Sequence, residues 1–167
     1  AFKILREAYA KYPNNGEIAF QYGFYSSEQA EAFPKDSDEY LKFYKDANIA
    51  FQRAAETEPD EQRYVAVAVT AASIKDYAQA VKIYEKLINE LDLPEYYRSL
   101  GVIKLEQGKK KEAIADLEKA AELTGDVQAY VRLADIYFQD NNTDKAMQYL
   151  LKVSELRPDI VLADLYL

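Results

Sequence analysis

Small and apolar residues recur along this chain at a fixed interval of 33 residues. Four alanines mark the interval, and each is followed four residues later by a bulky apolar residue and seven residues later by a small or apolar one: Ala47, Ala80, Ala113 and Ala146. Offsets of zero, four and seven lie on one face of an α-helix, so each alanine predicts an amphipathic helix. A unit repeated at this period must stack on its neighbours to bury its apolar face.

A second helical pattern precedes each of the last three alanines. It starts at Tyr64, Tyr97 and Tyr130 and continues at offsets of three, four and seven, with apolar or small residues at every position except Lys104. Such spacing is typical of another amphipathic helix. Short polar breaks separate the paired helices, at 75–76, 107–109 and 140–142.

Several polar residues stand where a helix N-cap is expected. Asp76 and Asn142 follow the breaks, and their side chains can accept from free backbone N–H groups. Asp76 with Gln79 fits a capping box, and Asp36 with Glu39 predicts a further cap. We therefore expect helices to begin at these points.

One repeat is longer than the others, because 46 residues rather than 33 separate Ala1 from Ala47. The flanking segments 21–33 and 38–58 keep a helical pattern, which predicts a lengthened helical hairpin. Five aromatic residues crowd it: Tyr25, Phe33, Tyr40, Phe43 and Tyr44. Either they pack the seam of the longer hairpin, or they form an extra contact surface for a partner.

These residues resemble the tetratricopeptide repeat (TPR) family. Segment 97–101 matches the first-helix pattern, and segment 47–54 matches the second-helix pattern. The closing proline of the family has counterparts at Pro13, Pro59 and Pro158, and two repeats replace it with Asp92 and Gly125. Tyr stands for the usual Trp throughout, and the period is one residue shorter than that of the family.

The resemblance implies an all-α fold, a right-handed α-solenoid of stacked antiparallel helix pairs with one hairpin lengthened. We expect a single solenoid segment over residues 1–167, excerpted from a longer array or capped by neighbouring copies. Its expected parts are a partial repeat, a lengthened repeat, three regular repeats and the start of a further helix, at 1–13, 16–59, 62–94, 95–125, 126–158 and 159–167.

The resemblance also implies that first helices line a concave face, the usual ligand groove of the family. First-helix residues not needed for helix packing are expected to form it: Phe20, Phe24, Gln62, Val65, Val69, Ala72, Glu95, Arg98, Val102, Leu105, Gln128, Val131, Asp135 and Phe138.

This predicted face is largely apolar, and two interpretations remain open. Either superhelical curvature or absent parts of the chain cover it, or it is a groove for an apolar or amphipathic peptide, with Arg98 and Asp135 setting polarity. The stretch 65–69 is apolar all round, so its helix should be covered on both sides. The chaperone-type carboxylate clamp is not expected, because Arg132 is its only basic candidate.

Composition narrows the function further. The net charge of −8 argues against nucleic acid, and no apolar run reaches the length of a membrane span. Without His or Cys, the usual zinc sites and Ser-His-Asp or Cys-His systems cannot form. No carboxylate stands on an apolar face in a way that suggests a raised pKa. The spacing of Asp140, Asn142 and Asp144 matches the start of a calcium-binding loop. The rest does not match, because Lys145 stands at the glycine position and Leu151 at the closing glutamate position.

We therefore predict a non-catalytic module that binds a protein or peptide segment, without cofactor or metal. Two alternatives remain: a self-associating structural array, and a helper region of a larger enzyme or of a secretion or assembly protein. RNA-binding helical repeats are disfavoured, because their grooves are basic.

Overall fold

The computed structural model describes residues 2–158, and every regular element in that range is an α-helix. The helices are α1 (Phe2–Lys11), α2 (Gly16–Ala30), α3 (Asp38–Thr57), α4 (Glu61–Ser73), α5 (Tyr77–Leu91), α6 (Pro94–Glu106), α7 (Lys110–Thr124), α8 (Val127–Gln139) and α9 (Thr143–Leu156). The chain divides into two compact units, residues 1–84 and 85–167, with the boundary inside α5. The predicted helix at 159–167 lies outside the described residues.

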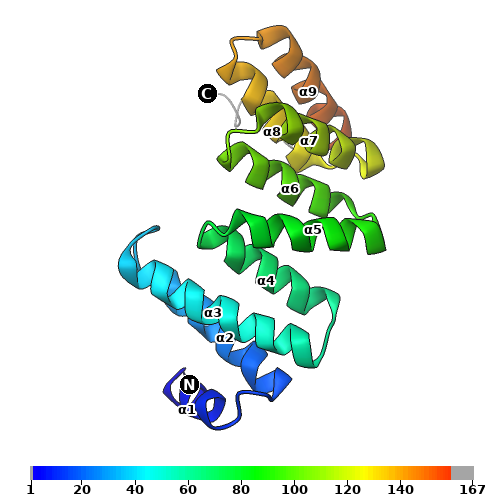
Figure 1. Ribbon diagram of the computed structural model, residues 1–167. Coiled ribbons are helices and arrows are strands. Elements are labelled where there is room, and N and C mark those ends of the chain that lie inside the picture. The colour runs from blue at the N-terminus through cyan, green and yellow to red at the C-terminus, as the bar shows by residue number, and fades with distance from the viewer. Residues whose placement is uncertain (1, 159–167) are drawn as a thin grey trace. The chain divides into compact units, whose positions relative to one another are not determined.

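Within each unit, consecutive helices pack as hairpins. In the first unit α2 packs along α3, and in the second α6 packs along α7 and α8 along α9 (Figure 1). Helix α3 also packs against α4, and α7 against α8. The all-α helical repeat fold expected from the 33-residue interval is therefore confirmed.

The turn between the two helices of a regular repeat has one geometry, repeated every 33 residues. A left-handed residue stands at Lys75, Gly108 and Asn141, with φ of 62°, 74° and 56°. The next backbone N–H donates to the carbonyl five residues earlier at 2.8 Å in all three turns. This is the bonding pattern of a Schellman motif, which satisfies carbonyls left free at a helix end.

The second helices end in two different ways. Before Pro59 and Pro158, Glu58 and Arg157 take φ near −138° and −136°, outside the helical range. Proline favours such a conformation in the preceding residue, because its ring clashes with a helical neighbour. Where the closing proline is replaced, Asp92 and Gly125 adopt φ of 49° and 70° instead.

The predicted helix caps are largely confirmed. The side chains of Asp76 and Asn142 accept from the backbone N–H groups three residues on, at 3.1 and 3.2 Å. The capping box is only half formed, because Gln79 Oε1 has no partner and the Asp76 N–H donates to Ala71.

The cap predicted at Asp36 was wrong. Ser37 caps α3 and accepts from the Tyr40 N–H at 3.2 Å, one residue later than expected. Asp36 is left-handed, with φ of 66°, and pairs with Lys75 at 3.1 Å. The turn bends one residue before the helix starts, so the hydroxyl reaches the free N–H and the carboxylate does not.

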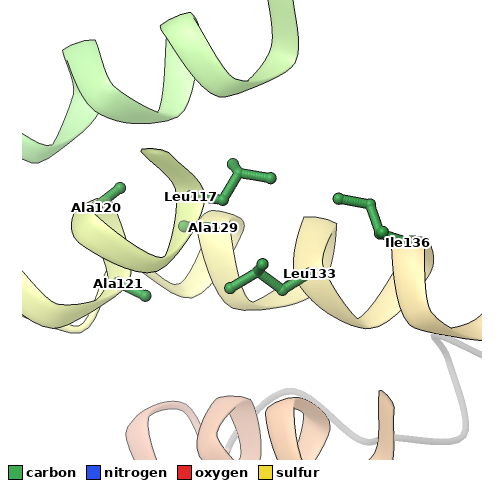
Figure 2. Packing of buried hydrophobic residues seen from close by; sticks show 6 residues of the cluster. All are labelled: Leu117, Ala120, Ala121, Ala129, Leu133 and Ile136. Carbon is green, nitrogen blue, oxygen red and sulfur yellow. The ribbon is translucent and has the colours of Figure 1, made fainter. Parts of the chain in front are cut away.

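The core of the second unit is an interleaved set of alanine and larger aliphatic side chains. Figure 2 shows six of them from α7 and α8: Leu117, Ala120, Ala121, Ala129, Leu133 and Ile136. All are buried, and Leu117 and Leu133 are fully so. Burying one such leucine contributes on the order of 2 kcal/mol, so this stripe holds α7 to α8.

Two glycines let the helices of a hairpin approach closely. A Cβ at Gly101 would lie 2.8 Å from Leu117 Cγ and 3.1 Å from the Ala113 carbonyl oxygen. A Cβ at Gly23 would lie 2.8 Å from two ring carbons of Phe51. A regular hairpin and the lengthened hairpin therefore use the same close glycine contact.

The aromatic residues of the lengthened hairpin mostly pack its seam. Tyr40 and Tyr44 are buried against Ala30 near the α2–α3 turn. Outside them, the Phe43 ring stacks on Phe33 at 5.7 Å between ring centroids. The Tyr44 hydroxyl donates a hydrogen bond to the Glu31 carboxylate, which ties the start of α3 to the end of α2. These contacts favour the seam interpretation over a free contact surface.

Candidate functional site

The predicted binding face of the first unit is formed by residues of α2 and α4, and none of them is buried. Phe24 and Val69 are the most exposed large apolar ones, at 49 % and 47 %. The expectation that the apolar stretch 65–69 is covered on both sides was therefore wrong at Val69. Its apolar pattern reflects one packed side, at Val67 and Ala68, and one side open to solvent.

An arginine joins the two helices of this face. The Arg63 guanidinium of α4 lies 5.3 Å from the centre of the Phe20 ring on α2. It also pairs with Glu17 at 3.5 Å and with Glu58 at 2.9 Å. Phe20 in turn packs on Phe51, with 5.4 Å between ring centroids. Phe20 is thus held in place beneath a charged cluster that the hydrophobic pattern did not reveal.

In the second unit the same face is formed by α6 and α8. Its polar end is closed by Arg98, whose Nε lies 3.1 Å from Asp126 Oδ2 and whose Nη1 donates to Gln128. Asp126 also caps α8 by accepting from the Ala129 N–H at 3.0 Å. Arg98 therefore fixes α6 against the start of α8, and its charge is already balanced within the chain.

The other end of this face is hollowed. A pocket of about 510 Å³ lies between the α6–α7 turn and α8, and eight residues line it: Leu105, Glu106, Gly108, Lys110, Arg132, Asp135, Ile136 and Gln139. Leu105 and Asp135 are two of the predicted groove residues. Leu105 also packs against the α7–α8 core, so the wall of the pocket is anchored to buried structure.

Charges of both signs surround the pocket. Lys110 pairs with Asp140, at the turns that flank the pocket. Arg132 is exposed one turn from Asp135 on α8, and the structure gives it no acidic partner among the described residues. An apolar wall beside one available cation and several carboxylates suits a mostly apolar segment with a polar or charged group at one place.

One carboxylate departs from the expectation that none has a raised pKa. Burial raises the pKa of Asp116 on α7, and the neighbouring Lys104 ammonium, 2.6 Å away, opposes that shift. Both side chains are largely covered between α6 and α7. This arrangement is an ion pair that fastens a hairpin, and Asp116 does not line the pocket.

The predicted groove residues were found on exposed or half-exposed faces of α2, α4, α6 and α8. The sequence pattern missed Glu106, Gly108 and Lys110, which bring the α6–α7 turn to the pocket. Helical offsets stop at the end of a helix, so they do not include turn residues. The one signal in the sequence was the glycine at position 108, which indicates a left-handed turn and has a φ of 74°.

Comparisons with known proteins agree with this architecture. Residues 104–166 match the sequence profile of the tetratricopeptide repeat family. Over these residues the chain is therefore similar to a tetratricopeptide repeat. A curated relative, mouse sperm-associated antigen 1, is 33% identical over 89 residues, which are 53% of this chain and 10% of the relative. The chain therefore spans about a tenth of the length of that relative.

Solved structures of other proteins share the fold. MamA from Desulfovibrio magneticus superposes with a TM-score of 0.72 at 18% identity, covering 95% of this chain and 84% of the other. YrrB, described as a TPR protein with an unusual peptide-binding site, gives 0.58 at 15% identity, covering 95% of each chain. PilF from Pseudomonas aeruginosa gives 0.59 at 19% identity, covering 92% and 66%.

The described residues also bear on metal binding and on membrane insertion. Across residues 2–158, no three acidic, His or Cys side chains come together in a way that could hold a metal ion. In the same range no helix combines the length and the apolar character that crossing a bilayer requires.

Proposed function

We propose that this chain is a non-catalytic interaction module that binds a protein segment along the first-helix face, with the pocket between α6 and α8 as its principal site. The repeat match and the shared fold support a role in protein interaction in general, without indicating a partner. The pocket of about 510 Å³ beside Leu105 carries the finer proposal.

The mechanism is preorganisation of the face. Arg98 is fixed to Asp126, Leu105 is fixed to the core, and Lys110 is fixed to Asp140. Because these contacts exist before a ligand arrives, binding costs little conformational entropy on the side of the module. An apolar side chain of the ligand would fill the pocket, and Arg132 would meet a polar or acidic group beside it.

Two charge-introducing substitutions test the proposal. Peptides that bind the wild-type chain are selected from a random display library, and their affinities are then measured for Leu105→Glu and Phe138→Glu. A buried carboxylate in an apolar contact is strongly unfavourable, so we expect affinity to fall at least about tenfold in each variant. Circular dichroism should show that helicity survives.

Met147→Glu is the matched control, because Met147 is an exposed apolar residue of the same unit, on α9. It should leave the affinity unchanged. Peptides that bind all three variants as tightly as the wild type would show that the ligand site lies elsewhere, and the α6/α8 proposal would be rejected.

Self-association is the second candidate function. Large apolar side chains are exposed on α1 and α9, where Ile4 is 72% and Leu151 is 53% accessible. Contacts between copies would cover such residues. Sedimentation velocity over a wide concentration range separates the two candidates, since a species that stays monomeric throughout argues against self-association.

A further inference from the structure

A second hollow in the second unit shares no residue with the pocket between α6 and α8. It has a volume of about 320 Å³ and lies between α7 and α9, over Tyr130 of α8. The rings of Tyr130 and Tyr149 form its aromatic wall, with 6.1 Å between their centroids. Glu118 and Glu122 of α7 stand opposite Lys152 of α9.

The same kind of hollow occurs in the first unit. A space of about 290 Å³ lies between α1 and α3 and is lined by Arg6, Tyr9, Ala10, Tyr22, Asp46 and Ile49. Its α1 residues stand five, eight and nine positions after Ala1, as Glu118, Ala121 and Glu122 stand after Ala113. A hollow between two consecutive second helices therefore occurs in both units, with its α1 and α7 residues at equivalent positions.

The charges at these equivalent positions differ. Arg6 occupies the place of Glu118, and Ala10 the place of Glu122. The α7–α9 hollow thus carries two carboxylates that the α1–α3 hollow lacks. The α1–α3 hollow has one carboxylate, Asp46, beside Arg6, and the α7–α9 hollow has two beside Lys152, so the α7–α9 hollow is the more acidic of the two.

The carboxylates of the α7–α9 hollow are held without being neutralised. The Tyr149 hydroxyl donates to Glu118 Oε1 at 2.9 Å, which orients that carboxylate and leaves its charge in place. The structure gives Glu122 no basic partner among the described residues. Lys152, the cation that lines the hollow, is already paired with Glu155 at 2.8 Å.

The tyrosine cluster beside the hollow already binds one cation of the chain. The Lys145 ammonium lies 4.7 Å from the centre of the Tyr137 ring. Tyr137 stacks on Tyr149 with 5.7 Å between centroids, and Tyr149 reaches the hollow. An aromatic ring attracts a cation over its face, so rings and carboxylates here favour the same kind of ligand.

We propose that the hollow between α7 and α9 binds a basic side chain, arginine in particular, presented by a protein partner. A guanidinium is planar, so it can stack on a tyrosine ring while it donates to a carboxylate, which a lysine ammonium does less well. The net charge of −8 also favours a basic protein segment as the partner. This site is separate from the proposed groove and does not depend on it.

The test uses the whole chain and two small probes of matched shape. N-acetyl-arginine amide carries the guanidinium, and N-acetyl-citrulline amide replaces it with a neutral urea. Titrated into labelled protein and followed by NMR, the arginine probe should shift resonances of Tyr130, Tyr149 and Glu118 in a saturable way. A single side chain should bind with a dissociation constant on the order of millimolar, and citrulline at least about fivefold more weakly.

Charge variants complete the test. Glu118→Gln with Glu122→Gln should weaken the arginine probe about fivefold or more, since both carboxylates are lost. Glu7→Gln with Glu28→Gln removes the same charge from exposed positions of α1 and α2, and it should leave binding unchanged. Equal binding of citrulline, equal loss in both double variants, or shifts that map to the α1–α3 hollow would each overturn the proposal.

Discussion

The lengthened hairpin α2–α3 and the regular hairpin α6–α7 share one kind of contact between their helices, but they differ in length and in how the hairpin ends. Both place a glycine of the first helix against a large side chain of the second, Gly23 against Phe51 and Gly101 against Leu117. The regular hairpin ends shortly after that contact in a tight left-handed turn at Gly108. The longer one continues to Ser37 and needs further contacts to hold it.

Those further contacts are aromatic and polar rather than aliphatic. Tyr40 and Tyr44 are buried in the added length, and the Tyr44 hydroxyl binds Glu31. The comparison teaches that the repeat can be lengthened without altering its central contact, provided that the added turns carry their own seam. The central contact should then contribute most to stability, and the added seam less.

Truncating a side chain of the central contact, or one of the added seam, should give the largest effects on stability. Leu117→Ala removes a fully buried side chain and should lower the free energy of unfolding by about 3 kcal/mol. Phe43→Ala removes a partly exposed ring from the added seam, so it should cost about half as much. Urea denaturation followed by circular dichroism measures both. An equal or larger cost for Phe43→Ala would mean that the added length is part of the principal core.

The glycine contacts should rank next. Gly101→Ala would press a Cβ against a backbone carbonyl oxygen as well as Leu117, so it should cost about 2 kcal/mol. Gly23→Ala meets only the Phe51 ring, which can tilt, and should cost about 1 kcal/mol less. Thermal unfolding of both variants gives the order. The reverse order would show that the Phe51 ring is the more rigid neighbour.

The tyrosine–glutamate pairs predict a loss of stability in alkali. Burial, and then the hydrogen bond to Glu31, raise the pKa of Tyr44 above its ordinary value; burial and Glu118 do the same for Tyr149. The folded state keeps these phenols protonated, so their contribution is complete below pH about 10 and is lost as the pH rises further.

Tyr44→Phe and Tyr149→Phe test this in the two kinds of hairpin. Each should cost about 1 kcal/mol at neutral pH through the lost hydrogen bond. Each should also lose less stability than the wild type between pH about 9 and 11, measured by urea denaturation at several pH values. Parallel pH curves for wild type and variants would contradict the raised pKa values.

Substitutions at the left-handed turn positions should give the smallest effects. Gly108→Ala meets no side chain, so its cost of about 1 kcal/mol would come from the backbone alone. Lys75→Gly relieves the same strain but gives up the exposed ion pair with Asp36, and it should stabilise by about 0.5 kcal/mol. Differential scanning calorimetry resolves such changes. A destabilised Lys75→Gly would show that the ion pair to the lengthened hairpin outweighs the strain.

Much of the fold could be predicted because periodicity reports directly on which face of a helix is buried. The alanines at the 33-residue interval are buried, and the polar breaks coincide with the turns. The cap at Ser37 was missed because two capping residues stand side by side, and only the backbone path decides between them.

Less of the candidate site could be predicted, because long charged side chains reach partners that spacing does not encode. Arg98 was expected to face a ligand, yet it binds Asp126 in the next repeat. The cluster at Arg63 depends on three separate carboxylates, one from α2 and two from the loop between α3 and α4. Both hollows of the second unit also need residues from three helices, which a single helical pattern does not combine.

The left-handed ends at Asp92 and Gly125 have a consequence for how such a chain can grow. They stand 33 residues apart and both have a positive φ, so the segment between them is one complete repeat. A gene duplication that copies residues 93–125 in tandem would join Gly125 to Leu93, with the dihedral angle at the junction already correct. Lengthening the protein by one repeat would then require no new turn, only a second copy of an old one.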